Sequence, residues 1–220
     1  MITIRVDDRD IEVEEGTNLL EACLINDIYI PNLCYLEGME EPSGSCRMCF
    51  VEIAGQDHPV PSCLVTVSRG MAVRTDTSPV RRLQRSALQL LLSAHLVDCA
   101  HCPANKKCAL QDIARFLKVG LKPKHLEPVL KEETTQEHPY LLHHPNRCIL
   151  CGKCIHVCKR AHGRPYLTFA KRGFDTFVSF YGEENAEELP CQKGFLCVEI
   201  CPVAALTLKE PGAADTTESQ

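Results

Sequence analysis

Thiol and imidazole side chains gather in three groups along this chain of 220 residues, and metal binding is the chemistry that they could perform together. The first group is Cys34, Cys46, Cys49 and Cys63. The second is His95, Cys99, Cys102 and Cys108. The third is Cys148, Cys151, Cys154, Cys158, Cys191, Cys197 and Cys201. Thiolates grouped in this way hold iron–sulfur clusters, which take up and release electrons.

The first group has the spacing C-x11-C-x2-C-x13-C, in which one close pair stands between two isolated cysteines. A [2Fe-2S] cluster needs four thiolates. A zinc site with four thiolates generally uses two close pairs instead. The spacing therefore predicts a [2Fe-2S] cluster on this group, with the loop 38–45 wrapped around it.

The second group has the spacing H-x3-C-x2-C-x5-C, so His95 supplies the fourth ligand that the three cysteines lack. Three thiolates and one imidazole complete the ligand set of a [4Fe-4S] cluster. A neutral imidazole makes the cluster less negative and raises its potential, as His does in Rieske centres. A zinc site with three Cys and one His is the alternative that these residues leave open.

The third group begins with the run C-x2-C-x2-C-x3-C of bacterial ferredoxins and ends in Cys201-Pro202. In two-cluster ferredoxins the fourth cysteine of each run serves the other cluster. A [4Fe-4S] cluster is therefore predicted on Cys148, Cys151, Cys154 and Cys201.

Three cysteines of this group are then left over, namely Cys158, Cys191 and Cys197. A complete second run would carry another cysteine at position 194, where this chain has Gly194. Two alternatives stay open. In the first, the remaining thiols hold a fourth cluster, which is [3Fe-4S] or a [4Fe-4S] cluster with an unusual fourth ligand. In the second, they form a vacant remnant.

The elements around the first group predict a β-grasp unit over residues 1–78. Apolar and polar residues alternate over 2–6 and 11–13, which is typical of a hairpin. A helix is expected after the N-cap Thr17, and strands over 50–53 and 59–67.

The second group falls between two predicted helices. Ser78-Pro79 is a typical helix start, with Ser78 as the cap, and a second helix over 109–119 should stop at Gly120. The fold class expected is α+β, with a bacterial-ferredoxin-like domain at the end. The expected divisions are 1–78 ([2Fe-2S] domain), 79–120 (helical His/Cys3 segment), 121–143 (connector), 144–209 (ferredoxin-type [4Fe-4S] domain) and 210–220 (disordered tail).

Composition narrows the function classes further. The net charge of −5 argues against nucleic-acid binding. No apolar run approaches the roughly 20 residues of a membrane span. We expect no disulfides, because the cysteine count of 15 is odd and the N-terminus does not have the pattern of a signal peptide. The chain is predicted to be cytoplasmic, with any membrane association arising through partners.

The sequence around these groups resembles a known family. The chain resembles the N-terminal iron–sulfur region of the 75-kDa-type subunit of respiratory complex I. It resembles more strongly the small diaphorase iron–sulfur subunit of NAD-reducing and electron-bifurcating [NiFe] hydrogenases. NAD-dependent formate dehydrogenases carry a similar module. The matching segments are 30–35, 45–49, 98–111, 147–151 and 200–203.

The resemblance implies an electron-relay subunit without a catalytic site of its own. Its partners would be a flavin- and NAD(P)H-binding subunit and the small and large hydrogenase subunits, or another terminal redox subunit, with ferredoxin as a further candidate. No Gly-rich phosphate loop is present in this chain, so NAD and flavin should bind elsewhere. The alternatives from other classes are a zinc-binding interaction module and a free-standing ferredoxin-like carrier.

Overall fold

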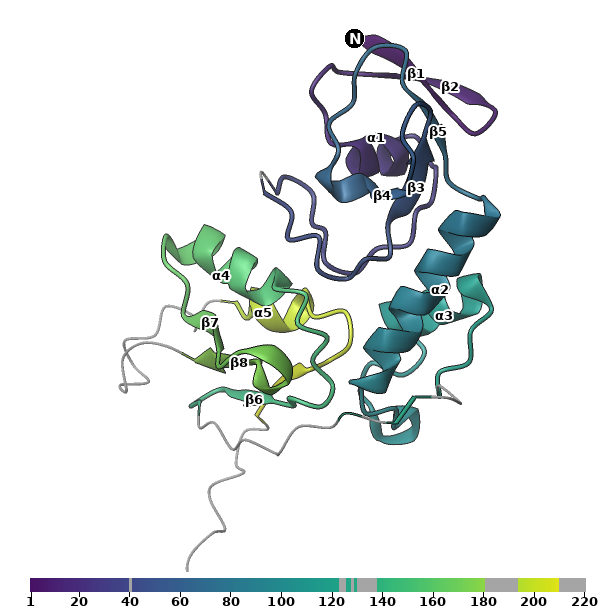
Figure 1. Cartoon of the computed structure of the whole chain (residues 1–220). Coiled ribbons are helices and arrows are strands. Elements are labelled where there is room, and N and C mark those ends of the chain that lie inside the picture. Colours follow the sequence, from purple (N-terminus) through teal and green to yellow (C-terminus); the bar gives the residue numbers. More distant parts are fainter. Residues whose placement is uncertain (40, 123–125, 128, 130–137, 181–193, 210–220) are drawn as a thin grey trace, which may run out of the picture.

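The computed structural model describes residues 1–39, 41–122, 126–127, 129, 138–180 and 194–209. Cys191, most of the predicted connector and the predicted tail lie outside these ranges. Three units follow one another along the chain in Figure 1: a sheet with one helix, a pair of helices, and a unit built from two small two-stranded sheets and two helices. The predicted α+β class is confirmed.

The first unit is a five-stranded mixed sheet packed against one helix. Its strand order is β2-β1-β5-β3-β4, with β1 and β5 parallel. Ile2, Ile4 and Val6 alternate with exposed residues and form the buried face of β1, as the sequence pattern predicts. The elements are β1 (Ile2–Val6), β2 (Arg9–Val13), α1 (Leu19–Ile25), β3 (Phe50–Ile53), β4 (Val60–Pro61), η1 (Ser62–Leu64) and β5 (Ala72–Arg74).

Two details of this unit differ from the prediction. The side chain that caps α1 is Asn18 rather than Thr17, because the Asn18 side chain accepts from the backbone N–H groups of Leu20 and Glu21. The strand expected over 59–67 is only two residues long. Pro61 has no N–H to continue the ladder, and the chain turns there into the short helix η1.

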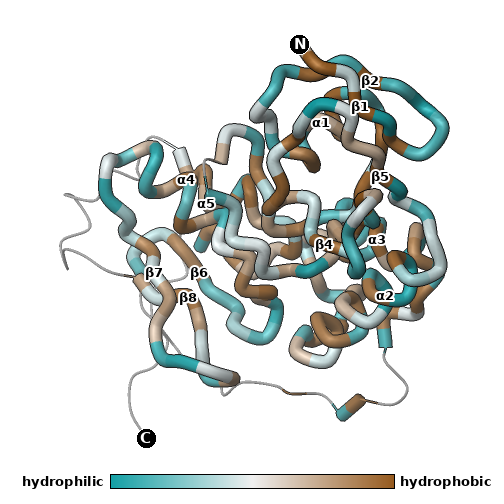
Figure 2. Tube along the Cα trace, turned by 45° about the horizontal axis from the view of Figure 1, so that its top comes forward, coloured by the Kyte–Doolittle hydropathy of each residue, from teal (hydrophilic) through white to brown (hydrophobic). Residues whose placement is uncertain are grey.

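The second unit consists of α2 (Ser78–Ser93), η2 (Cys99–His101) and α3 (Ala109–Leu117). Thr77 caps α2 through its hydroxyl, so the predicted cap Ser78 is wrong by one residue. Helix α3 ends at Leu117, before the predicted stop at Gly120, because the C-cap residue Lys118 has left-handed backbone angles. Figure 2 shows both hydrophobic and hydrophilic residues along α2. Its buried residues recur every four positions and therefore share one face; they are Val80, Gln84, Leu88 and Leu92.

The third unit places α4 (Lys153–His162) and α5 (Leu196–Glu199) beside two small antiparallel sheets. The first sheet pairs β6 (Leu141–His143) with β9 (Leu206–Leu208), and the second pairs β7 (Leu167–Ala170) with β8 (Phe177–Phe180). A single-turn helix, η3 (Gly173–Asp175), connects β7 and β8. Residues 141–143, which we expected in the connector, thus form a strand that joins the two ends of this unit.

A single apolar cluster joins the three units, and we call it the central cluster. Its members include Leu33, Cys34, Cys46, Met48, Leu88, Leu92, Cys108, Leu110, Ile113, Leu117, Ile149, Cys151, Val203 and Ala205. Burying each of the large aliphatic side chains stabilises the fold by about 1.5–3 kcal/mol. Among the described residues, no helix is long and apolar enough to span a bilayer.

Candidate metal centres

The four thiols of the first group are all buried, with at most 4% of each residue exposed. They lie in two pairs. The sulfur atoms of Cys34 and Cys46 are 3.4 Å apart, and the hydrogen bond from Cys46 lowers the pKa of Cys34. A hydrogen bond from Cys63 likewise lowers the pKa of Cys49. Two thiol pairs match the donor set of a [2Fe-2S] cluster, which takes two thiolates on each iron.

The loop before Cys46 closes over this site. The backbone N–H of Cys46 donates to the sulfur of Cys34 at 3.5 Å. Gly44 has a φ of 58°, a conformation that favours glycine, and a Cβ at this position would lie 2.8 Å from the side chain of Leu64. Glycine therefore lets the loop approach the short helix η1 that carries Cys63.

The four residues of the second group line one small pocket between α2 and α3, together with Leu92, Leu110 and Val203. His95 follows the end of α2, Cys99 lies in η2, and Cys108 is the N-cap residue of α3. Burial raises the pKa of Cys108, and the nearby thiols of Cys102 and Cys99 raise it further. Buried sulfur donors in this arrangement would be stabilised as thiolates by a bound cationic metal.

The orientation of His95 determines which of its nitrogen atoms can bind a metal. Its Nδ1 lies 2.9 Å from the carbonyl oxygen of Arg147. A carbonyl oxygen only accepts, so Nδ1 carries the proton and Nε2 keeps its lone pair. Burial lowers the pKa of His95, which favours the neutral imidazole. His95 thus has the tautomer of a metal-binding imidazole whose other nitrogen is held by a backbone carbonyl.

The predicted ligands of the third cluster also line one pocket, which lies between α4 and the β6–β9 sheet. These residues are Cys148, Cys151, Cys154 and Cys201. Burial raises the pKa of Cys151 to about 12, and the thiols of Cys148 and Cys201 contribute to the shift. The backbone N–H of Ala205 donates to the sulfur of Cys201 at 3.2 Å, as is usual around cluster sulfurs.

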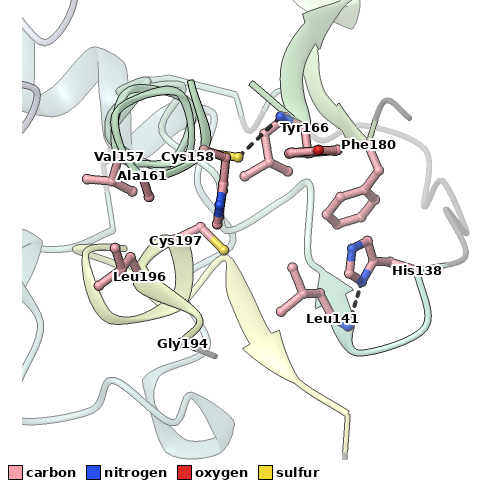
Figure 3. A pocket seen from close by; sticks show the side chains of 12 residues that line it. His138, Leu141, Val157, Cys158, Ala161, Tyr166, Phe180, Gly194, Leu196 and Cys197 are labelled. Carbon is pink, nitrogen blue, oxygen red and sulfur yellow. Dashed lines mark hydrogen bonds between the residues drawn. The ribbon is translucent and has the colours of Figure 1, made fainter. Parts of the chain in front are cut away.

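Two of the three leftover cysteines lie in another pocket of the third unit (Figure 3). Cys158 and Cys197 line it together with His138 and Gly194. The sulfur of Cys158 accepts a hydrogen bond from the backbone N–H of Tyr166 at 3.2 Å. Cys191, the third member of the set, lies outside the described residues. Gly194 is placed where a fourth cysteine would complete the set, but it offers no side chain.

The donor chemistry of the three main groups fits iron–sulfur clusters. Among the described residues, no three Cys, His, Asp or Glu side chains are placed to hold a single metal ion.

Of the other cysteines, Cys23 is fully buried in the core of the first unit, and burial raises its pKa to about 12. His138 is held by the backbone N–H groups of Tyr140 and Leu141, both of which donate to its Nδ1.

Two contacts and one buried hydroxyl around these sites could not be predicted from the motifs. Ser45 donates from its hydroxyl to the carbonyl oxygen of Leu150 at 3.3 Å, which links the first site to the third. The contact of His95 with Arg147 links the second site to the third. The buried hydroxyl of Ser62 lies beside the first site. The only hint in the sequence is that each of Ser45, Leu150, Arg147 and Ser62 directly precedes a candidate ligand.

Three family models match the chain, one for each unit. The model for the 2Fe-2S iron-sulfur cluster binding domain matches residues 1–78. The NADH-ubiquinone oxidoreductase-G iron-sulfur binding region matches residues 84–121. The ferredoxin-like domain of NADH-quinone oxidoreductase subunit 3 matches residues 138–207. Fold and motifs together therefore define an iron–sulfur protein with 2Fe-2S and 4Fe-4S binding regions.

Comparisons with whole proteins agree with the family models. The chain is 34% identical to the second G-type subunit of NADH-quinone oxidoreductase from Rhizobium meliloti, over 94% of this chain and 24% of that protein. It is 31% identical to the NADP-reducing hydrogenase subunit HndD of Solidesulfovibrio fructosivorans, over 96% of this chain and 36% of that protein. The chain thus spans about a quarter to a third of the length of these curated relatives.

A solved structure of an NAD+-reducing [NiFe]-hydrogenase in the H2-reduced state is also similar. It has a TM-score of 0.81 and 30% sequence identity, and the match covers 99% of this chain and 90% of that one. The chain belongs to the family of iron–sulfur subunits that includes the G-type subunits of NADH-quinone oxidoreductase and this hydrogenase chain. The resemblance noted in the sequence is thereby confirmed.

Proposed function

We propose that this chain relays single electrons within an NAD(P)-linked oxidoreductase complex. The observation that carries the proposal is the central cluster, in which candidate ligands of all three sites meet. Cys34 and Cys46 come from the first site, Cys108 from the second and Cys151 from the third. Electron tunnelling weakens steeply with distance, so a relay requires its centres to lie close together. An apolar surrounding also excludes water and so tunes their potentials.

The contacts between sites support an order in which the third site lies between the other two. The hydroxyl of Ser45, beside Cys46, reaches the backbone of Leu150, beside Cys151. The imidazole of His95 reaches the backbone carbonyl of Arg147, which is bonded directly to Cys148. Both outer sites are thus joined to the third through one hydrogen bond and a short stretch of chain.

The proposed ligand sets are those predicted from the spacing. Bound clusters would supply one-electron chemistry, and the chain would supply thiolates, one neutral imidazole and backbone N–H donors. Cys158, Cys191 and Cys197 lack a fourth thiolate because position 194 is glycine, and we propose three clusters for the native chain. The outer partners in this scheme are a flavin- and NAD(P)H-binding subunit and a second catalytic subunit.

A hydrogenase is the favoured second subunit. The similar solved structure is a chain of an NAD+-reducing [NiFe]-hydrogenase with a TM-score of 0.81, and the relative HndD is a subunit of an NADP-reducing hydrogenase. These two likenesses favour a relay of hydrogenase type. Formate dehydrogenase and complex I-like enzymes remain the alternatives for the same relay.

The order of the relay is tested by removing its middle centre. In the double variant Cys151→Ala/Cys154→Ala, purified as the native complex, NAD(P)H should no longer reduce one of the two outer clusters. Dithionite should still reduce both, as followed by EPR, which shows that the outer clusters are present. Reduction of both outer clusters by NAD(P)H at the native rate would overturn the proposed order.

A further inference from the structure

Ser62 carries a buried hydroxyl group whose role the fold does not explain. It is the first residue of η1, directly before Cys63, and it is fully buried at 0% exposure. Its Oγ has no hydrogen-bond partner within the part of the chain that the structure describes. A buried hydroxyl without a partner destabilises a fold, so each such group calls for an explanation, such as a bound water, an ion or a redox role.

The backbone holds this hydroxyl against the first site. The N–H of Ser62 donates to the carbonyl oxygen of Cys49 at 2.8 Å, which fixes the start of η1 beside that cysteine. Since Cys63 is the next residue in η1, the hydroxyl lies on the Cys49–Cys63 side of the first site.

The other surroundings offer the hydroxyl little else. Cys49 and Cys63 belong to the apolar core of the first unit, together with Leu20 and Val51. The Oγ makes no hydrogen bond to a backbone carbonyl among the described residues, so the thiols of Cys49 and Cys63 are the candidate acceptors. A donor at this place has a direct consequence for redox chemistry, because hydrogen bonds to cluster sulfurs stabilise the more negative, reduced state.

We propose that the Ser62 hydroxyl donates a hydrogen bond to a sulfur on the Cys49–Cys63 side of the [2Fe-2S] site and raises the potential of that cluster. This inference rests on the proposed function, because it requires the first site to hold the cluster. Ser62 is a positioning and tuning residue, and it is not a ligand. It sets how readily the first centre of the relay accepts an electron.

The test is the variant Ser62→Ala in the anaerobically purified chain with its clusters. An EPR-monitored redox titration should show the midpoint potential of the [2Fe-2S] cluster shifted to more negative values. Its spin concentration and the potentials of the other clusters should stay unchanged. The H/D-sensitive shift of the Fe–S stretching bands in resonance Raman spectra should also become smaller.

Two further variants complete the test. Ser62→Thr keeps a hydroxyl and should restore most of the native potential. Ser68→Ala removes an exposed hydroxyl from the same unit and should change nothing. An unchanged [2Fe-2S] potential in Ser62→Ala, with the cluster present, would overturn the inference. Absence of a [2Fe-2S] signal from the native chain would instead overturn the proposed function.

Discussion

The Nδ1 of His95 lies 2.9 Å from the carbonyl oxygen of Arg147, the residue that precedes Cys148. This one contact does two things. It leaves the lone pair on Nε2 of a residue that lines the same pocket as the thiols of the second site. It also connects a candidate ligand of the second site to a candidate ligand of the third. A histidine therefore suits this position for reasons of geometry as well as of charge.

The variant His95→Cys tests the effect of the imidazole on potential. A thiolate in place of a neutral imidazole adds one negative charge to the site, so the reduced cluster becomes harder to form. We expect the second cluster to be retained, with its midpoint potential lowered on the order of 100 mV or more, as the contrast between Rieske and all-cysteine centres indicates. The measurement is an EPR-monitored redox titration.

The matched control for this prediction is His101→Ala. His101 is a neighbour of Cys102, but its side chain is 81% exposed and its Nδ1 pairs with Asp98. Its replacement should leave the iron content and the potential of the second cluster close to native. Equal effects of the two variants would contradict the assignment of His95 as a ligand.

The variant Gly194→Cys tests the leftover cysteines. Gly194 lines the same pocket as Cys158 and Cys197, and a Cβ at this position would meet no described atom within 4 Å. The described part of the chain thus leaves room for the new thiol, which would complete the run that the sequence lacks. Iron should rise from about 10 to about 14 atoms per chain.

Gly194→Ala controls for the loss of glycine and should keep about 10 iron atoms. If the native chain already held about 13 or 14, the leftover thiols would form a fourth cluster without any substitution. If Gly194→Cys stayed at about 10, the assignment of Cys158, Cys191 and Cys197 as the remnant of a second run would be wrong.

Gln84 links the first two units, and its removal should destabilise the chain. This fully buried side chain on α2 donates to the carbonyl oxygen of Phe50 at 3.2 Å and accepts from Arg81 at 3.0 Å. Gln84→Ala leaves the Phe50 carbonyl without this donor and opens a small cavity. We expect a loss of about 2–3 kcal/mol in the free energy of unfolding.

Thermal unfolding of the anaerobic protein measures this effect, with Gln89→Ala as the matched control. Gln89 lies on the same helix and is exposed, so its replacement should change the stability by less than about 0.5 kcal/mol. Since Phe50 directly follows Cys49, the Gln84 variant should also release iron from the first site sooner on heating. Indistinguishable unfolding of the two variants would contradict the proposed role of Gln84.

The sequence predicted those parts of the fold that have a local signal. Alternating apolar residues predicted β1 and β2, and a helical period predicted α2 and α3. For both α1 and α2, the predicted capping residue is one position away from the residue that caps the helix in the structure. Asn18 adjoins Thr17, and Thr77 adjoins Ser78, so in each case two neighbouring residues could cap and only the backbone angles decide between them.

Short elements and contacts between distant segments could not be predicted. Strands β5, β6 and β9 each have three residues, which is too short to show a period, and their pairing joins distant parts of the chain. The contacts of Ser45 with Leu150 and of His95 with Arg147 span 105 and 52 residues. The spacing of the cysteines predicted the donor sets, but the sequence carries no signal for how the sites lie against one another.

The most direct test of the account is the content of iron, zinc and acid-labile sulfide in the anaerobically purified chain, with EPR spectra of the reduced sample. We predict about 10 iron and about 10 sulfide atoms per chain, and EPR signals from one [2Fe-2S] and two [4Fe-4S] clusters. Zinc in place of iron, with no labile sulfide, would contradict the relay and favour a zinc-binding interaction module.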